Sequence, residues 1–189
     1  MTILQGMGVL VITAIIVVLD QATKLMVKAR FFLGESIEVL GDVLRFTYIE
    51  NPGMAFGIRI GGKYFFTVFA AIATVVIMIY LYRIRREKLP ARLSLALILG
   101  GAIGNLIDRF AYGSVIDFID VGINDTRWPV FNIADSAVSI GMVILMALVL
   151  FEKDKTATEP ESPALPSTKA SPSDEHDNWL GTRSRTPSS

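Results

Sequence analysis

Four aspartates interrupt or adjoin the apolar segments of this chain. They are Asp20, Asp108, Asp117 and Asp135. An ionisable group in an apolar segment is costly, and its presence suggests a function. Two carboxylates that are held close together cannot both ionise, so they share one proton and titrate as a pair. The ionised carboxylate takes a proton from water, and the protonated one polarises a carbonyl group. These residue types predict the chemistry of an aspartic peptidase, although the residues alone do not select the pair.

The composition argues against other common kinds of catalytic site. The chain has no cysteine, which excludes disulfides, cysteine-ligated zinc, iron–sulfur clusters and thiol nucleophiles. The single histidine, His176, lies far along a polar tail, which argues against a Ser-His-Asp triad and a histidine metal site. Ser136 with a lysine is the alternative nucleophile, but no lysine lies near it in the sequence. We therefore expect neither a metal ion nor another cofactor.

Spacing places several polar residues on shared helical faces. Asn105, Asp108 and Arg109 are three and four residues apart, so they lie on one face of a helix. Asn132 and Asp135 are three residues apart, and Ser136 adjoins them. Carboxylates and one guanidinium group could therefore converge at one depth in the structure.

Each of these residues also has a simpler interpretation. Asp108 and Arg109 could form an ion pair at a helix end, Asn132 could be an N-cap, and Asp135 could favour the helix dipole. Taken singly, a structural interpretation is favoured over a functional one for each of these residues. For Asp20 alone, the structural and functional interpretations are equally supported. Together, the structural interpretations do not explain why the acids gather at one end of three apolar segments.

The overall composition predicts a membrane protein. Hydrophobic residues make up 52% of the 189 residues, charged residues make up 19%, and the mean hydropathy is +0.51. Soluble globular chains carry about 25% charged residues. The balance of 18 basic and 18 acidic residues argues against binding to nucleic acid. Four segments approach the roughly 20 apolar residues that a spanning helix needs. They are 7–27, 64–82, 93–107 and 130–151. We therefore predict an α-helical membrane protein with four transmembrane helices.

The distribution of basic residues predicts the orientation in the membrane. Short loops rich in lysine and arginine stay in the cytoplasm. The link at 83–92 has five such residues, so four spans place both termini in the cytoplasm and the aspartates near the outer face. Lys24, Lys28 and Arg30 lie on the opposite side from this link, and we interpret them as interfacial or structural.

Two loops are expected on the outer side, at 28–63 and 108–129. Residues 36–49 are rich in β-branched and aromatic side chains, with a turn signal at Gly41 and Asp42. This pattern predicts a small β-hairpin that lies on the membrane surface. The second loop contains Asp117, for which the sequence predicts no regular structure.

The end of the chain differs in composition from the rest. Residues 154–189 are rich in proline, serine, threonine and charge and have few apolar side chains. Such a segment cannot bury enough apolar surface to become ordered. We therefore predict a membrane domain at 1–153 and a disordered cytoplasmic tail at 154–189.

Small residues recur at intervals of four in two of the predicted spans. Ala96, Gly100 and Gly104 form one such series, and Ala137 and Gly141 form another. This pattern allows helices to approach closely, so we predict packing rather than ligand contact for these residues.

Five short motifs, in their order along the chain, resemble those of lipoprotein signal peptidase, also called signal peptidase II. They are LDQATK at 19–24, NPGMAFG at 51–57, GGAIGNLIDR at 100–109, GSVIDF at 113–118 and FNIADSAVSIG at 131–141. The resemblance covers nearly all of the predicted membrane domain. Any one of these motifs alone would be weak, whereas the ordered set is specific.

The resemblance implies a multi-pass aspartic endopeptidase of the bacterial inner membrane, with a β-sheet cradle on the membrane surface. Its substrates would be prolipoproteins whose cysteine already carries diacylglyceryl, and it would cut just before that cysteine to free the signal peptide. Prolipoprotein and membrane lipid would be its partners, and we expect a monomer.

The resemblance also assigns roles to individual residues. The catalytic acids would be Asp117 and Asp135, and Asp120 would be an additional acid without a catalytic counterpart. Nine further positions match residues that support or line the site of the family. They are Asp20, Lys24, Asn51, Gly101, Asn105, Asp108, Arg109, Asn132 and Ala134.

Two alternatives to a peptidase use the same residues. A small ion- or proton-coupled transporter could employ buried acids, but transporters place their sites near the membrane midplane and often contain inverted repeats. Here the acids lie at one end of the spans, and the sequence shows no repeat. The other alternative is a scaffold whose polar cluster is structural.

Overall fold

The structure is a computed structural model, and it describes residues 3–53 and 64–157. Among these residues the chain forms four helices and a four-stranded sheet. The elements in chain order are α1 (Ile3–Arg30), β1 (Ser36–Leu40), β2 (Leu44–Asn51), α2 (Phe65–Arg83), α3 (Leu89–Tyr112), β3 (Val115–Ile123), β4 (Thr126–Arg127) and α4 (Ile133–Ala157).

All four described helices are long and apolar enough to cross a membrane, which confirms the predicted fold class. The qualifying segments are Gly8–Arg30, Phe65–Arg83, Leu89–Ala111 and Ile133–Phe151. The third helix is longer than predicted at both ends. It begins with Pro90 in its first turn, where a missing backbone N–H is tolerated. It ends at Tyr112 and is capped by Gly113, which adopts a φ of 76° and donates its N–H to the carbonyl oxygen of Arg109 at 3.1 Å.

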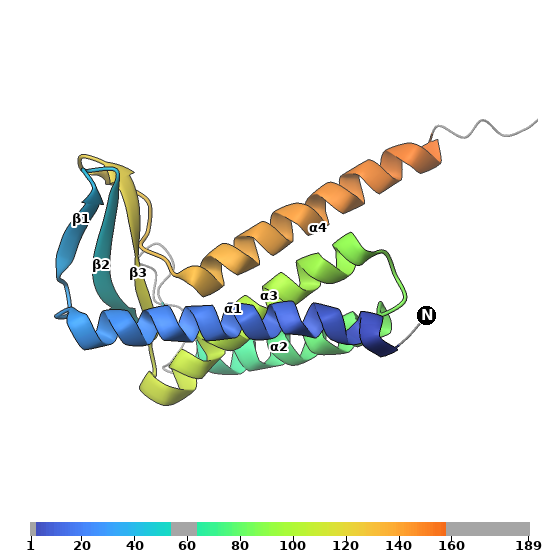
Figure 1. The fold of residues 1–189 in the computed structure, drawn as a ribbon, viewed down its shortest axis with the longest axis horizontal. Helices are drawn as coiled ribbons and strands as arrows, with labels where there is room; N and C mark the ends of the chain where they lie inside the picture. Colours follow the sequence, from blue (N-terminus) through green and yellow to red (C-terminus); the bar gives the residue numbers. More distant parts are fainter. Residues whose placement is uncertain (1–2, 54–63, 158–189) are drawn as a thin grey trace, which may run out of the picture.

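Helix α3 is the central element of the bundle, because it packs against α1, α2 and α4. Figure 1 shows the sheet at the end of the bundle where α1 and α3 finish and α4 begins. The link between α2 and α3 lies at the opposite end, near the start of α1. We call these the sheet end and the loop end of the bundle.

Small residues bring the helices close together, as the sequence predicts. A Cβ atom added to Gly100 of α3 would lie 2.9 Å from Cβ of Ile16 on α1. A Cβ atom added to Gly141 of α4 would lie 2.6 Å from the carbonyl oxygen of Ser94 on α3. Side chains larger than hydrogen would therefore force the helices apart at both positions.

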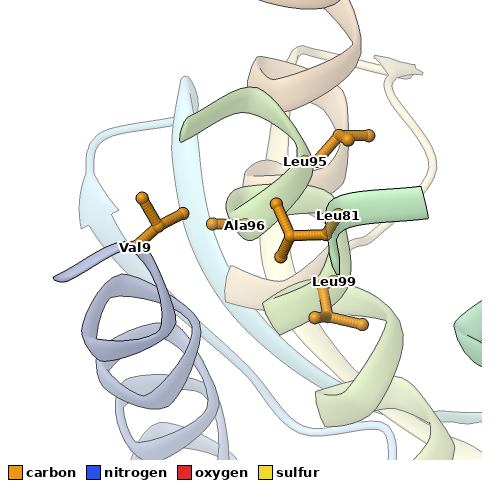
Figure 2. Close-up of a cluster of buried hydrophobic side chains, with 5 residues drawn as sticks. All are labelled: Val9, Leu81, Leu95, Ala96 and Leu99. Atoms are coloured by element: carbon orange, nitrogen blue, oxygen red, sulfur yellow. The ribbon is translucent and has the colours of Figure 1, made fainter. Parts of the chain in front are cut away.

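At the loop end an apolar cluster joins three helices. Its buried members are Val9 of α1, Leu81 of α2, and Leu95, Ala96 and Leu99 of α3. Figure 2 shows these five side chains gathered where the three helices meet. This apolar cluster fixes the ends of the helices that are farthest from the sheet.

The sheet is antiparallel, with the strand order β1-β2-β3-β4. The predicted hairpin is confirmed: β1 and β2 pair across a turn at 41–43. The structure differs from the sequence prediction at 115–123, a part of the second outer loop that forms the third strand, β3. Asp117 and Asp120 interrupt the apolar pattern of this segment, and its pairing partner β2 is distant in the sequence. Asp117 is therefore held on a strand, opposite Ile49 of β2.

A second apolar cluster attaches the sheet to the helices. Val27 of α1, Tyr48 of β2, and Ile116 and Phe118 of β3 are its buried members. Phe118 also meets Phe46 edge to face, with ring centroids 6.0 Å apart. The sheet is thus anchored to the end of α1, which fixes the position of β3.

Helix α4 continues to Ala157, beyond the predicted boundary of the membrane domain at residue 153. The rest of the predicted tail, with His176, lies outside the described residues, as does the segment 54–57 of the second motif. Lys24 and Lys28 both have structural contacts, described below, in agreement with their interpretation from the sequence.

Candidate active site

A lysine ammonium group between two carboxylates forms the centre of the sheet end. Nζ of Lys24 lies 2.8 Å from Oδ2 of Asp20 and 2.8 Å from Oδ2 of Asp108. Lys24 is only 1% exposed, and both aspartates are fully buried. Helix α1 supplies two of the charges and α3 supplies the third, so the ion pairs connect these two helices inside the protein.

Both carboxylates also accept hydrogen bonds from other groups. Oδ1 of Asp20 accepts the backbone N–H of Ala134 at 2.9 Å. Oδ2 of Asp108 accepts the backbone N–H of Ile116 at 3.1 Å. The side-chain amide of Gln21 donates to both aspartates, at 3.2 Å to Asp20 and 2.9 Å to Asp108. The two acids therefore fix the first turn of α4 and the start of β3, the two elements that carry Asp135 and Asp117.

Two asparagines connect this charged centre to the other two aspartates. Oδ1 of Asn105 accepts hydrogen bonds from Nζ of Lys24 at 3.0 Å and from Nδ2 of Asn132 at 3.2 Å. Nδ2 of Asn105 donates to Oδ1 of Asp135 at 2.8 Å. An ammonium group is only a donor, so it holds the oxygen of Asn105 toward itself and leaves the amide nitrogen facing Asp135.

Asn132 reaches Asp117 and also caps α4. Its Nδ2 donates to Oδ1 of Asp117 at 2.6 Å and to the carbonyl oxygen of Ile116 at 3.2 Å. Its Oδ1 accepts the backbone N–H of Asp135 at 2.9 Å, and its own N–H donates to Oδ2 of Asp135 at 3.3 Å. This reciprocal pair of bonds is a capping box. The N-cap interpretation of Asn132 is therefore confirmed, and the same side chain contacts Asp117.

Asp117 is buried between two amide donors. Nδ2 of Asn51 donates to its Oδ2 at 3.2 Å, while Asn132 donates to its Oδ1. Asp117 is 2% exposed. Burial, with the nearby charge of Asp135, raises the pKa of Asp117 to about 7, although the two amide donors and the charge of Lys24 oppose this shift. Asp117 and Asp135 are thus electrostatically coupled, and Asp117 exchanges its proton near neutral pH.

Arg109 adds a positive charge on the α3 side of the site. Its guanidinium group interacts electrostatically with Asp135, Asp117 and Asp108, and Nη1 donates to the carbonyl oxygen of Asn105 at 3.1 Å. The structure pairs Asp108 with Lys24, which differs from an ion pair between the neighbours Asp108 and Arg109. The reason is geometric, since Asp108 faces α1 across the bundle.

Gly101 and Ala134 act at the contact between α3 and α4. A Cβ atom on Gly101 would collide with the carbonyl oxygen of Ala134 and would lie 2.7 Å from Cγ2 of Val138. Ala134 is fully buried and offers its N–H to Asp20. The structure therefore gives Gly101 a packing contact with Ala134 and Val138, whereas the other ten predicted residues join one hydrogen-bonded network. Those ten are Asp20, Lys24, Asn51, Asn105, Asp108, Arg109, Asp117, Asn132, Ala134 and Asp135.

Asp120 has a separate set of partners. Its Oδ1 lies 2.6 Å from Nε of Arg127, and its Oδ2 accepts the hydroxyl of Thr47 at 2.8 Å. These bonds join β2, β3 and the β4 strand away from Asp135. The hydroxyl of Ser136 donates to the carbonyl oxygen of Asn132 at 2.9 Å, which is a local helical contact. Among the described residues, neither side chain is hydrogen-bonded to Asp20, Asp108, Asp117 or Asp135.

Sequence reasoning missed two contributors near the site. Gln21 lies within the first motif, and its place between Asp20 and Lys24 was a usable signal. Glu50, next to Asn51, accepts the hydroxyl of Tyr48 at 2.7 Å and that of Ser114 at 3.3 Å. The bond from Tyr48 lowers the pKa of Glu50, and burial together with that bond raises the pKa of Tyr48 to about 12.

Lys28 completes this group at the end of α1. Its Nζ lies 3.6 Å from Oε1 of Glu50 and 3.7 Å from the ring centroid of Tyr112.

Within the described residues, no three histidine, cysteine, aspartate or glutamate side chains gather as metal ligands.

The fold and the site define a membrane protein of four spanning helices that buries acid–base groups at one end, beside a small sheet. Residues 12–151 match the model of the family described as signal peptidase (SPase) II, and the chain belongs to this family.

Relatives and solved structures agree with this membership. The chain is 42% identical over 153 residues to the lipoprotein signal peptidase of Syntrophus aciditrophicus (strain SB), which covers 78% of this chain and 95% of that protein. It is also 42% identical over 147 residues to the lipoprotein signal peptidase of Halothermothrix orenii, with 78% and 97% covered. A bacterial membrane enzyme structure determined by the in meso method at 2.3 Å resolution aligns with a TM-score of 0.67 and 32% identity, over 82% of this chain and 93% of that chain.

Proposed function

We propose that this chain cleaves the signal peptide from prolipoproteins, and that Asp117 and Asp135 are its catalytic pair. Membership of the signal peptidase II family supports the reaction. The observation that supports the pair is that two coupled carboxylates, on β3 and on the first turn of α4, are each held by an asparagine of one network. The substrate would carry diacylglyceryl on its cysteine, and the cut would fall just before that residue.

In this proposal the two carboxylates share one proton and activate a water molecule. Asp117 has a pKa of about 7, so below that pH it holds the proton that the pair shares. The ionised carboxylate takes a proton from water as the water attacks the scissile carbonyl carbon. The protonated carboxyl donates to the carbonyl oxygen and stabilises the charge that develops there. The proton taken from water then passes to the amide nitrogen as the C–N bond breaks. The carbonyl group of the new carboxylic acid forms as its oxygen returns a proton to the other carboxylate, which restores the pair.

The surrounding residues keep the pair in register. Asn105 directs its amide nitrogen at Asp135 because Lys24 holds its oxygen. Asn132 directs its amide nitrogen at Asp117 because the backbone N–H of Asp135 holds its oxygen. Arg109 supplies positive charge beside the pair. These contacts pre-arrange the site, so that little reorganisation is needed during the reaction.

We further propose that the chain lies in the bacterial inner membrane with both termini in the cytoplasm and the pair near the outer face. The basic link at 83–92 supports this orientation. A reporter enzyme that works only in the cytoplasm should be active when it is fused after Lys155. Activity of a reporter that works only in the periplasm, fused at the same position, would contradict the proposal. The peptidase family argues against the transporter and scaffold alternatives.

The pair is tested by replacing each acid with asparagine and measuring cleavage of a purified, lipidated precursor. Asn has nearly the shape of Asp but cannot cycle a proton. Asp117→Asn and Asp135→Asn should each lower kcat by about 10²–10⁴-fold. Asp120→Asn is the matched control, because Asp120 lies on the same strand but pairs with Arg127. Near-normal cleavage by either of the first two variants, in folded protein, would disprove the assignment.

A further inference from the structure

Gly53, in the turn after β2, controls how Asn51 faces the site. The backbone N–H of Gly53 donates to Oδ1 of Asn51 at 3.0 Å. Because this bond fixes the oxygen of the side-chain amide, the nitrogen must face the other way, where it donates to Oδ2 of Asp117 at 3.2 Å. The orientation of a donor to Asp117 therefore depends on the backbone position of Gly53.

Two features hold that backbone position, and both require glycine. Gly53 has a φ of 101°, in the left-handed region that glycine adopts without strain. The ring of Phe66 on α2 covers it, so that an added Cβ atom would lie 2.5 Å from Cδ2 and 2.9 Å from Cγ of Phe66. Phe66 is itself placed by Phe65, which it meets edge to face with centroids 5.3 Å apart.

The other left-handed glycines of the same region provide a contrast. Gly34 has a φ of 85° and Gly41 a φ of 49°, and an added Cβ atom would meet nothing within 4 Å at either position. Of these three glycines, Gly53 is the one that combines a left-handed backbone with a neighbouring ring. Its contact with Phe66 links the first turn of α2 to the turn that carries Asn51.

We propose that Gly53, packed against Phe66, is a positioning residue that acts on Asp117 through the side-chain amide of Asn51. This inference rests on the proposed role of Asp117. Gly53 itself touches none of the reacting groups; it fixes a donor that does. Displacement of Gly53 should therefore change the proton affinity of Asp117 as well as the rate.

The direction of the change follows from the groups that face Asp117. Asp135 of α4 raises its pKa, while Asn51, Asn132 and Lys24 of α1 lower it. Arg109 of α3 also interacts with it. A hydrogen bond from Asn51 favours the ionised form, so its loss raises the pKa of Asp117. The pair then keeps its last proton to higher pH. The alkaline limb of the pH profile, which is the range where kcat/KM falls as the pH rises, therefore moves to higher pH.

The test is the pH dependence of kcat/KM for Gly53→Ala, assayed in the full-length protein with a lipidated precursor peptide. We expect a several-fold lower kcat and an upward displacement of the alkaline limb by about 0.5–1 pH unit. Gly34→Ala is the matched control, since it introduces the same side chain at a left-handed backbone in open space. It should lower stability only, with an unchanged profile.

A second comparison separates an action through Asn51 from a general disturbance. Asn51→Ala should displace the alkaline limb as Gly53→Ala does, and the double variant should show no further displacement. If Gly53→Ala does not fold, Phe66→Ala removes the same contact and should move the limb in the same direction. An unchanged limb in the folded variants, or displacements that add, would overturn the inference. Asp117→Asn with normal activity would instead overturn the proposed function.

Discussion

The two ends of the helix bundle are built from the same helices but by different means. At the loop end, α1, α2 and α3 meet through the apolar cluster of Val9, Leu81, Leu95, Ala96 and Leu99. At the sheet end, α1, α3 and α4 meet through charged and amide side chains that are as deeply buried. Apolar side chains can exchange with lipid at little cost, whereas a buried charge needs each of its partners.

This difference separates stability from activity. At the loop end, the hydroxyl of Thr13 on α1 donates to the carbonyl oxygen of Ala96 on α3 at 3.0 Å, a single bond from a side chain to the backbone. At the sheet end each contact leads to another, from Lys24 through Asn105 to Asp135. We therefore expect changes at the loop end to alter the amount of folded protein alone, and changes at the sheet end to alter turnover too.

The largest effect on stability should come from Lys24→Met. This change leaves Asp20 and Asp108 buried without their counter-charge, which costs about 3–5 kcal/mol when one partner of a buried ion pair is removed. Turnover of the remaining folded protein should also fall, because the oxygen of Asn105 loses its donor. Thermal unfolding in detergent and single-turnover cleavage measure the two effects.

Lys28→Met is the control, because Lys28 is a partly exposed lysine on the same helix. Its ion pair with Glu50 is 3.6 Å long and open to solvent. Partly exposed pairs contribute about 0–1 kcal/mol, so this variant should unfold close to the parent protein. Equal destabilisation by the two substitutions would show that Lys24 is not the centre of the buried network.

A smaller effect is expected from two glycines on one face of α3. A Cβ atom on Gly104 would lie 2.5 Å from Oδ2 of Asp20, and one on Gly100 would lie 2.9 Å from Cβ of Ile16. Both alanine variants should lose stability, by about 1–3 kcal/mol as for other overpacked sites. Gly104→Ala should in addition lower kcat, since it displaces Asp20. If Gly100→Ala lowers kcat per folded molecule as much, the separation between the two ends is wrong.

The smallest effect is the pH dependence of the unaltered protein. Burial raises the pKa of Asp117 to about 7. In the proposed mechanism the pair holds one proton. The proton is present below that pH and lost above it. The value of kcat/KM should therefore decline about tenfold per pH unit once the pH exceeds this pKa. A rate that stays flat across the alkaline range would show that Asp117 does not carry the shared proton.

The sequence predicted the spans and the hairpin because both depend on local patterns. Apolar length defines a spanning helix, and β-branched residues around Gly41 and Asp42 define a hairpin. Strand β3 was missed, since Asp117 and Asp120 break its alternation and its partner strand lies far away in the sequence.

The members of the site could be named from motifs, but their contacts could not. Asp108 adjoins Arg109 in the sequence, yet the fold pairs it with Lys24 across the bundle. Lys24 lies on the opposite side of the membrane from the basic link, which the orientation rule does not explain. Its burial between Asp20 and Asp108 accounts for this position, and that contact is visible only in the folded structure. The contact of Gly53 with Phe66 likewise has no local signal, because it joins a turn to a different helix.

We propose that Asp117 and Asp135 act as one unit, and a double-mutant cycle of kcat can test this coupling. Asp117→Asn, Asp135→Asn and the double variant would be compared on one lipidated precursor, at matched amounts of folded protein. Residues that act together are not additive, so the double variant should be little slower than either single variant. A double variant whose loss equals the product of the two single losses would show that the two carboxylates act independently and would contradict the account.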